Sequence, residues 1–377
     1  MNSERTSRIL VRGVNWLGDA VMATPALLRL RERFPEAHIT LLTPEKLRDL
    51  WLHHPAVNDA VSFGPGERVF SVGRKLKEKI FDLALVLPNS PRSALEVWLA
   101  RIPKRVGYAR PWRNWFLTQL VQERPNGVAM RKRTIREINE LTTDNARRPV
   151  STIQYPSSAH HIYQYLHLVA ALGANPEPRA PLLAVTEGEV AAVRKQFDFP
   201  EMSATQRPLL ALNPGAEYGP AKRWPIEHFI AAARQIQQHT DGFWVILGGR
   251  GDIELAKRVA AGIAPHASRL TLHANLAGQT SLRELMAVLK LCRVLLTNDT
   301  GPMHVAAALG TPVVVPFGST SPELTGPGLP GDPRHRLLKS DAPCSPCFLR
   351  ECPIDFRCMN GISVERAVAA VVEAVIR

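Results

Sequence analysis

The sequence lacks long apolar runs: no stretch of about 18 residues is predominantly apolar, as a membrane-spanning helix requires. The first residues, MNSERTSRILVRG, are polar and turn directly into a strand pattern, unlike a secretory signal peptide. We therefore expect a cytoplasmic protein. Cysteine is scarce, with five residues in the chain, and disulfides are not expected in that compartment.

Acidic residues are outnumbered by basic ones, 34 Asp and Glu against 47 Lys and Arg, which gives a formal net charge of +13. A basic surface suits nucleic acid, an anionic membrane face or a phosphorylated substrate. Hydrophobic residues make up 45% of the chain and charged residues 21%, the balance of a soluble globular protein. A chain of 377 residues exceeds one typical core, so we expect two domains.

The opening segment lacks two standard phosphate-binding motifs. It has no G-x-G-x-x-G, which argues against a dinucleotide fold of the usual type. Gly13 and Gly18 have the glycine spacing of a P-loop, but Asp19 stands where that motif requires lysine. A strand is predicted over residues 7–13 and a helix over 20–34, so Asp19 lies at the helix start, where the dipole favours a carboxylate. Asp19 is therefore a candidate general base, with a helix cap as the alternative.

The stretch 294–318, VLLTNDTGPMHVAAALGTPVVVPFG, has the pattern of one β-loop-α-β unit. Its apolar runs predict buried strands over 294–296 and 312–317, with a helix over 303–309 between them. The intervening loop then lies at the carboxyl end of a parallel strand, where open α/β sheets bind ligands.

Four residues of this unit are candidates for binding an anionic ligand. The first N–H groups of the helix can hold a phosphate without a side-chain cation. Thr300 adds a hydroxyl, Gly301 permits close approach to the backbone, and His304 lies one turn further along the same face. Alternatively, Asp299 and Thr300 only cap the helix.

The second half of the chain offers further loops of this type. A strand over 209–212 ends in NPGAEYGPAKRWP (213–225), where Lys222 and Arg223 could clamp phosphate oxygens. The strand over 244–247 ends in Gly248-Gly249 before another helix. The Pro-rich segment GANPEPRAP (173–181) reads as a linker. Two α/β domains joined by such a linker suggest a cleft enzyme that handles a nucleotide-activated substrate.

The first half contains basic residues interleaved with aromatic ones. Between residues 101 and 113 there is no acid, and the tryptophans and tyrosine of this region are Tyr108, Trp112 and Trp115. The basic residues here are Arg101, Lys104, Arg105, Arg110 and Arg113, followed later by Arg131, Lys132, Arg133 and Arg136. Such a pattern suits single-stranded nucleic acid, an anionic glycolipid or a merely solvated face. No nucleic-acid recognition motif is present.

Four cysteines cluster near the end as Cys344, Cys347, Cys352 and Cys358, whereas Cys292 lies alone in an apolar helix pattern and is expected in the core. The Cys344-Ser-Pro-Cys347 pair followed by two more cysteines could hold zinc. The later spacing lacks a second C-x-x-C, so the sequence alone does not decide whether these four cysteines hold a metal.

Four motifs together resemble those of the family 9 glycosyltransferases. They are NWLGDAVMATPAL (15–27), LPNSPRS (87–93), NPGAEYGPAKRWP (213–225) and TNDTGPMHVAAALG (297–310). The similarity extends over most of the chain in the right order, and the third motif is the most distinctive. The cysteine-rich tail is less uniform in that family.

The resemblance implies an α/β protein of GT-B fold, with two Rossmann-like domains facing across a cleft. Residues 1–177 would bind the acceptor, and residues 178–377 would bind ADP-heptose and carry the cysteine-rich segment. It also implies inverting transfer of L-glycero-D-manno-heptose onto the first heptose of the lipopolysaccharide inner core, at the inner face of the inner membrane. No cofactor, metal or nucleic acid is expected. Peripheral contact with the anionic membrane is expected.

Carried over by position, the resemblance assigns roles to individual residues. Asp19 matches the catalytic base and Lys222 the residue that neutralises the donor diphosphate. Donor-binding residues are expected to be Asn213, Gly215, Lys222, Gly248, Asp299, Thr300, Gly301 and His304. Acceptor-binding residues are expected to be Asn89, Arg92, Arg105 and Arg110. Lys222 with a helix N-terminus can stabilise departing ADP without a divalent metal.

Two alternatives stay open at this point. A family 9 enzyme for another core position would share these motifs. A basic protein that binds nucleotide or nucleic acid without catalysis would share the charge and the phosphate loops.

Overall fold

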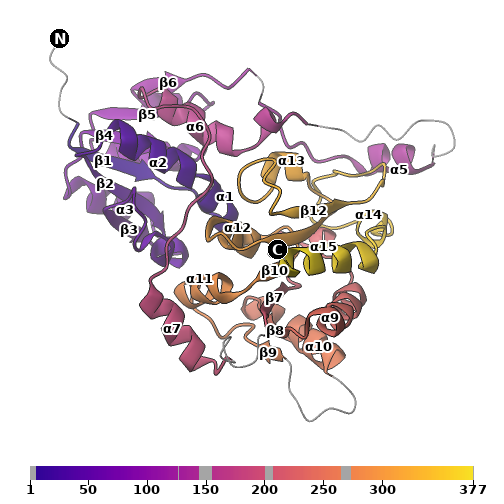
Figure 1. Ribbon diagram of the computed structural model, residues 1–377. Coiled ribbons are helices and arrows are strands. Elements are labelled where there is room, and N and C mark those ends of the chain that lie inside the picture. Colours follow the sequence, from indigo (N-terminus) through magenta and orange to yellow (C-terminus); the bar gives the residue numbers. More distant parts are fainter. Residues whose placement is uncertain (1–5, 126, 144–154, 200–206, 265–272, 377) are drawn as a thin grey trace. The chain divides into compact units, whose positions relative to one another are not determined.

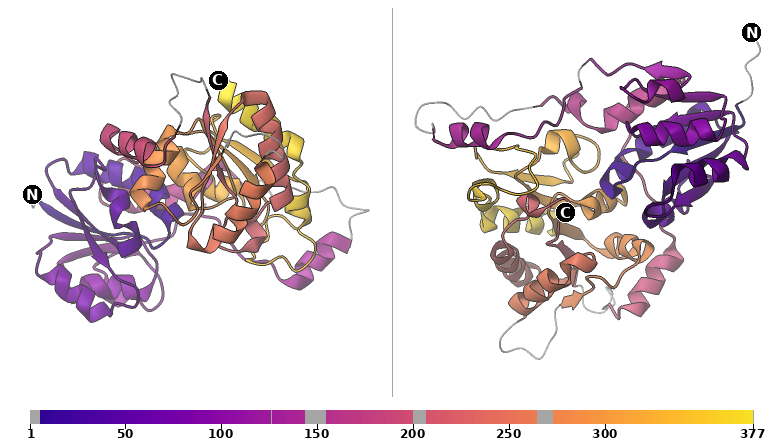
Figure 2. Two further views of the ribbon diagram at one scale, coloured as in Figure 1. Left: turned by 90° about the horizontal axis from the view of Figure 1, so that it is seen from below. Right: turned by 180° about the vertical axis from the view of Figure 1, so that it is seen from behind.

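The computed structural model describes residues 6–125, 127–143, 155–199, 207–264 and 273–376; the polar start, residues 1–5, lies outside them. The described chain forms two compact units, and each is considered by itself. Unit 1 contains residues up to Gly127 and Ser158–Ala184, and unit 2 contains Val128–Ser157 and Val185–Arg377. Each is a six-stranded sheet with helices on both faces (Figures 1 and 2).

Unit 1 has six parallel strands in the order β3-β2-β1-β4-β5-β6. The strands are β1 (Arg8–Arg12), β2 (His38–Pro44), β3 (Asp59–Phe63), β4 (Leu83–Val86), β5 (Lys104–Tyr108) and β6 (Gln119–Val121). The α-helices are α1 (Leu17–Met22), α2 (Thr24–Arg33), α3 (Val69–Lys77), α4 (Pro91–Leu99) and α6 (Ile162–Ala170). The 3-10 helices are η1 (Glu45–Trp51), η2 (Asn114–Phe116) and η3 (Ser157–Ala159).

Unit 2 repeats this plan with the strand order β12-β11-β10-β7-β8-β9, also parallel. The strands are β7 (Leu209–Asn213), β8 (Phe243–Ile246), β9 (His273–Asn275), β10 (Val294–Thr297), β11 (Val313–Phe317) and β12 (Arg336–Lys339). The helices are α5 (Ile135–Thr143), α7 (Glu187–Gln196), η4 (Pro220–Lys222), α9 (Ile226–Thr240), η5 (Arg250–Asp252), α10 (Ile253–Ile263), α11 (Leu282–Leu291), α12 (Gly301–Ala308), α13 (Pro322–Thr325), α14 (Arg357–Asn360) and α15 (Val364–Ile376).

Buried apolar strands explain the two sheets. All residues of β7 and β10 are buried, as parallel strands covered on both faces require. Helices then cover the faces: α2 packs against α6 in unit 1, while α9 packs against α15 and α7 against α11 in unit 2. Ser281 and Glu284 form a capping box at the start of α11. The α/β class and the two Rossmann-like sheets are therefore as predicted.

The two units are not divided at the expected boundary between residues 177 and 178. The chain enters unit 2 at Val128, returns to unit 1 for α6, and leaves it after Ala184. The early excursion is held by α5, whose Ile138 is buried in a cluster with Cys344 and Cys347. This contact spans about half the sequence, so no local pattern could predict it.

Both sheets reverse their strand order at one point, between β1 and β4 in unit 1 and between β7 and β10 in unit 2. In open α/β sheets such a switch point leaves a crevice at the carboxyl ends of the strands, and ligands bind there. Asn89, Lys222 and Asp299 lie in the segments that follow β4, β7 and β10, and Asp19 lies in the first turn of α1, after β1. These four residues therefore lie at the sheet edge where such folds bind ligands, and their roles stay predictions.

Candidate active site

Lys222 and Asp299 form the central polar contact of unit 2. Lys222 Nζ lies 2.6 Å from Asp299 Oδ2, and the side chains are only 13% and 4% exposed. Thr320 Oγ1 donates to the same carboxylate oxygen at 2.5 Å. The ammonium also lies 4.9 Å from the ring centre of Tyr218, within cation–π range. An ammonium has three N–H donors, so Lys222 can hold Asp299 and still bind an anion.

Two buried asparagines join the loops after β7 and β10. Asn298 accepts a hydrogen bond from the Trp224 N–H at 2.9 Å and donates to Pro214 O at 2.7 Å. Asn213 Nδ2 donates to Thr297 Oγ1 at 3.1 Å. Because these groups are buried and satisfied, they fix the two loops relative to each other. Asn213 thus has a structural partner, and its contact with a donor stays a prediction.

Glycines in unit 2 permit close packing within the protein. A Cβ on Gly215 would lie 2.4 Å from the Asp252 carboxyl carbon, and one on Gly248 would lie 2.9 Å from Asp252 Cβ. At Gly219 a Cβ would meet Arg350 O at 2.4 Å, the carbonyl that accepts from the Ala221 N–H. Packing against Asp252 therefore suffices to explain Gly215 and Gly248, and their donor contact stays a prediction.

The N-terminus of α12 has no side-chain cap. Thr300 is the N-cap residue and makes no side-chain cap hydrogen bond, while the Asp299 carboxylate accepts from Lys222 and Thr320. Capping is thus not what the Thr300 hydroxyl does in this structure. Gly301 begins the helix, and His304 is 5% exposed on its first turn. This arrangement leaves the helix end suited to an anion.

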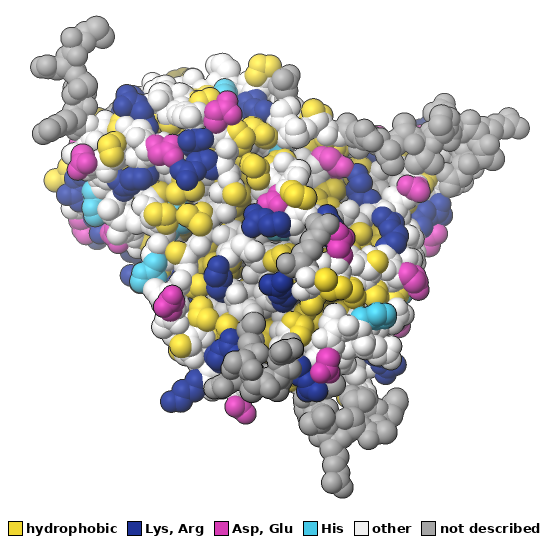
Figure 3. All heavy atoms as spheres, in the orientation of Figure 1, with side chains coloured by type: hydrophobic (Ala, Val, Ile, Leu, Met, Phe, Trp, Pro, Cys, Tyr) yellow, Lys and Arg dark blue, Asp and Glu magenta, His cyan; other side chains and the backbone are white. Residues whose placement is uncertain are grey.

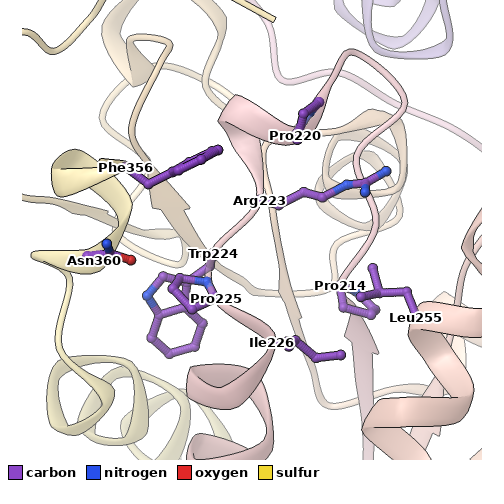
Figure 4. A pocket seen from close by; sticks show the side chains of 9 residues that line it. All are labelled: Pro214, Pro220, Arg223, Trp224, Pro225, Ile226, Leu255, Phe356 and Asn360. Atoms are coloured by element: carbon purple, nitrogen blue, oxygen red, sulfur yellow. The ribbon is translucent and has the colours of Figure 1, made fainter. Parts of the chain in front are cut away.

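A pocket of about 320 Å³ lies beside the loop that follows β7 (Figure 4). Its walls are mostly apolar, with the guanidinium of Arg223 and the amide of Asn360 as polar groups. Lys222 and Asp299 are not among its lining residues, which are Pro214, Pro220, Arg223, Trp224, Pro225, Ile226, Leu255, Phe356 and Asn360. The pocket is therefore a neighbour of the Lys222–Asp299 pair and does not contain it.

Asp19 has partners from α6 that sequence reasoning missed. It lies in the first turn of α1, whose N-cap residue is Trp16, and its side chain is 27% exposed. His161 Nδ1 is 3.5 Å from Asp19 Oδ1. The Tyr165 hydroxyl donates to Asp19; burial and then this carboxylate raise the pKa of Tyr165 well above its usual value. The rings of His161 and Tyr165 stack at 5.2 Å. Asp19 is therefore a half-buried carboxylate held by a tyrosine.

A buried ion pair supports the loop that leads to Asp19. Arg12 Nε donates to Glu96 at 2.8 Å, and both side chains are almost fully buried. Arg12 also donates to Asn15 Oδ1 at 3.1 Å and to Gly13 O. Burial lowers the pKa of Arg12, and the charge of Glu96 opposes that shift. Breaking a pair of this kind leaves an uncompensated buried charge, so Arg12 and Glu96 are positioning residues for α1.

The expected acceptor residues have partners within unit 1. Arg92 pairs with Glu96 at 2.9 Å, and Arg105 donates to the carbonyl of Phe116 at 2.6 Å and to that of Ile102. Arg110 forms an ion pair with Glu123, and Asn89 accepts from Arg113 Nη1 at 3.3 Å. The acceptor contacts of Asn89, Arg92, Arg105 and Arg110 stay predictions.

Arg113, one of the basic residues between positions 101 and 113, is fully buried and therefore does not contribute to an exposed basic surface. Burial, and then the charge of Arg110, lower the pKa of Arg113 to about 10. The second cluster belongs to unit 2, where Arg131 and Arg136 pair with Glu137 and Glu140. Basic side chains are scattered over the visible face among acidic and apolar ones (Figure 3).

Three of the four clustered cysteines pack in hydrophobic cores of unit 2. Cys344, Cys347 and Cys358 are buried, and burial is the main cause that raises the pKa of each, that of Cys358 to about 12. Within the described ranges, no group of three or more His, Cys, Asp or Glu is arranged to hold a metal ion. Cys292, also buried, is the residue after α11 and not within it.

Comparisons with known proteins agree with the motifs. The model of glycosyltransferase family 9 (heptosyltransferase) matches residues 69–144 and 145–356. Lipopolysaccharide heptosyltransferase 2 of Salmonella typhimurium and that of Escherichia coli are each 33% identical over 85% of this chain and 85% of their own length. The structure of E. coli ADP-heptose LPS heptosyltransferase II superposes with a TM-score of 0.75, 28% identity and 98% coverage of both chains.

A glycosyltransferase family 9 structure from Veillonella parvula shares the fold, with a TM-score of 0.76 and 21% identity over 100% of this chain and 99% of its own. The residues matched by the family model include the switch-point loops of unit 2, with Lys222 and Asp299, and most strands of the two sheets. The chain belongs to glycosyltransferase family 9, the heptosyltransferases.

Proposed function

We propose that this glycosyltransferase transfers L-glycero-D-manno-heptose from ADP-heptose to the first heptose of the lipopolysaccharide inner core, with inversion at the anomeric carbon. The donor is named in the E. coli structure, and the relatives at 33% identity are lipopolysaccharide heptosyltransferases 2. The observation that carries the proposal is the Lys222–Asp299 pair, a buried lysine at the switch point of unit 2.

Lys222 is the cation that would meet the donor diphosphate. Its contact with Asp299 holds the ammonium in place before the donor arrives, so little side-chain entropy is lost on binding. Negative charge grows on the β-phosphate as ADP departs, and a preorganised cation stabilises that charge more than it stabilises the ground state. The start of α12, with Thr300 and His304 beside it, would add the Gly301 N–H to the same anion, because Pro302 has no N–H and the Met303 N–H bonds to Thr300 O.

Asp19 would act as the base on the acceptor. In a direct displacement the acceptor hydroxyl attacks the anomeric carbon, its proton passes to a carboxylate, and the bond to ADP breaks on the opposite face. The hydrogen bond from Tyr165 favours the ionised form of Asp19, which is the form that can accept a proton. Arg12 and Glu96 fix the loop that presents this carboxylate.

The acceptor would be bound by unit 1, where Asn89 and Arg110 follow the carboxyl ends of β4 and β5 and Arg92 lies in the first turn of α4. An inner-core acceptor is anionic and attached to lipid, so we also propose peripheral contact with the inner face of the inner membrane. None of the described helices is both long and apolar enough to cross a bilayer.

The test is a donor and acceptor screen with the purified protein. ADP-heptose is compared with other nucleotide sugars, each with inner-core acceptors that carry no heptose, one heptose or two. We expect transfer only from ADP-heptose and only to the acceptor with one heptose, and the anomer of the product reports inversion. Transfer to the acceptor that lacks heptose would assign the enzyme to another core position. A preference for another sugar would refute the proposed donor.

A further inference from the structure

Two tryptophans on the loop between β5 and β6 are almost fully exposed. Trp112 is 83% exposed and Trp115 is 87% exposed. The next most exposed of the chain's seven tryptophans, Trp16 and Trp98, are 48% and 46% exposed. Scattered apolar side chains are normal on a protein surface, but two large aromatic rings within one turn are not an ordinary solvated face.

The loop exposes these rings from a fixed backbone. Its centre is held by Arg113, which is fully buried and donates to Pro88 O at 2.7 Å. Asn114 Oδ1 accepts from the Arg110 N–H at 2.8 Å, and Phe116 O accepts from Arg105 Nε at 2.6 Å. Trp112 itself has φ +63°, an uncommon conformation for a bulky residue. The exposure of the indoles is thus built into the loop, and strain of this type clusters at functional positions.

The surroundings of the loop are apolar and basic. Trp98 contacts Phe116 edge to face, with ring centres 5.7 Å apart, and remains half-exposed. The adjoining turn between α4 and β5 presents Arg101 and Lys104 to solvent, and neither has an ion-pair partner within the described part of the chain. Arg105 connects this turn to the loop through Ile102 O and Phe116 O. Exposed indoles and cations without an ion-pair partner therefore lie on adjoining segments of unit 1.

We propose that this surface, formed by Trp98, Arg101, Lys104, Trp112 and Trp115, docks on an anionic lipid bilayer. Indole rings partition into the interfacial layer of membranes, and lysine and arginine near the surface are attracted by anionic headgroups. The formal net charge of +13 adds a long-range attraction to the same partner. The inference deepens the proposed function by naming the residues that bring unit 1 to the membrane holding its acceptor.

A sugar-binding platform is the rival use of two exposed indoles. Such a site also needs polar side chains that are free to bind hydroxyls. Here the amide oxygen of Asn114 and the carboxylate of Glu123 are engaged within the protein, and the guanidinium of Arg113 is fully buried beneath the loop. The loop therefore offers aromatic faces and cations, which suit a lipid surface.

Vesicle binding tests the proposal without donor or acceptor. The full chain is sedimented with vesicles of phosphatidylcholine alone and with vesicles that contain phosphatidylglycerol. We expect binding to the anionic vesicles that weakens with added salt. Trp112→Ser/Trp115→Ser should weaken it by roughly tenfold or more, because two interfacial anchors are lost. The matched control is Phe70→Ser, which removes a side chain 70% exposed on α3 of the same unit.

Fluorescence and kinetics separate docking from acceptor binding. In the wild type, anionic vesicles should shift tryptophan emission to the blue and brominated lipids should quench it, and the double variant should lose both effects. The double variant should raise KM for acceptor embedded in vesicles but leave kcat/KM for a deacylated, soluble acceptor unchanged.

Vesicle binding that is unaffected by the double substitution would overturn the proposal. A KM for the soluble acceptor that is raised in the double variant would also overturn it, and would show that the indoles bind sugar. Vesicle binding does not depend on heptose transfer, so the proposed function and this inference can fail separately.

Discussion

Lys222 and Asp299 come from loops 77 residues apart and meet at 2.6 Å, with both side chains largely buried. The pair closes the switch point of the unit 2 sheet, because the two loops follow the neighbouring strands β7 and β10. Asp299 thus holds the Lys222 ammonium in place, and its direct contact with the donor stays a prediction.

The first prediction separates the structural and catalytic parts of this pair. Lys222→Met leaves the Asp299 carboxylate buried with Thr320 as its remaining partner, and should lower the free energy of unfolding by about 3 kcal/mol or more. Lys222→Met/Asp299→Asn removes the stranded charge, so most of the stability should return. Donor affinity and turnover should stay low in both variants, because both lack the cation. Thermal melting and ADP-heptose titration measure the two effects; recovery of donor affinity in the double variant would contradict the assigned role.

The second prediction concerns the base. Asp19→Asn should leave the Kd for ADP-heptose nearly unchanged and lower kcat by roughly a hundredfold or more, the scale of a lost general base. Single-turnover kinetics with saturating acceptor measures the chemical step directly. Near-normal turnover would show that another group accepts the proton.

The third prediction uses Tyr165, which donates to Asp19 and was not identified from the sequence. Removing the hydroxyl in Tyr165→Phe frees the Asp19 carboxylate to leave the orientation that faces the acceptor, so kcat should fall by roughly tenfold while the Kd for ADP-heptose stays unchanged. Tyr108→Phe is the matched control, because that hydroxyl bonds to Gln164 O and His167. Equal kcat in Tyr165→Phe and wild type would show that Tyr165 does not position Asp19.

Sequence reasoning found the residues that stand on recognisable loops. Asp19, Lys222 and Asp299 follow apolar strand patterns and lie beside glycines, so their place at strand ends could be predicted. The same apolar runs predicted the central strands of both sheets. The family resemblance added the roles, which composition and spacing alone left open.

Contacts between distant segments were beyond such reasoning. Arg12 and Glu96 are 84 residues apart, and the one available signal was a charged residue at the end of the apolar strand RILVR. His161 and Tyr165 reach Asp19 only because α6 returns to unit 1 after the excursion of residues 128–157. Arg113 looked exposed because its neighbours in the sequence are basic, yet its side chain folds inward to Pro88.

The fourth prediction concerns divalent metal. Because Lys222 and the start of α12 supply positive charge for the diphosphate, transfer from ADP-heptose should remain within about twofold of normal in excess EDTA. Initial rates with and without chelator, at fixed ionic strength, provide the measurement. Activity that is lost in EDTA and regained on adding magnesium would show that a metal, together with Lys222, stabilises the diphosphate charge.

The last prediction concerns the pH dependence of stability through His54. The ring is 3% exposed, its Nδ1 accepts from the Ala56 N–H at 3.2 Å, and burial lowers the pKa of His54 to about 4. In the unfolded chain the pKa is near its usual 6.5, so between about pH 4 and 6.5 the unfolded state binds more protons than the folded one. Stability from the neutral ring is therefore complete above about pH 6.5 and decreases as the pH falls toward 4. Between pH 7.5 and pH 5, His54 should account for about 2 kcal/mol of the free energy of unfolding that the wild type loses, and His54→Gln, which cannot be protonated, should remove that share. His335, whose pKa burial also lowers to about 4, adds a loss of its own in both proteins. His38→Gln, at an exposed position of β2, is the control and should retain the full loss. Equal losses in wild type and His54→Gln would show that His54 does not titrate in this range.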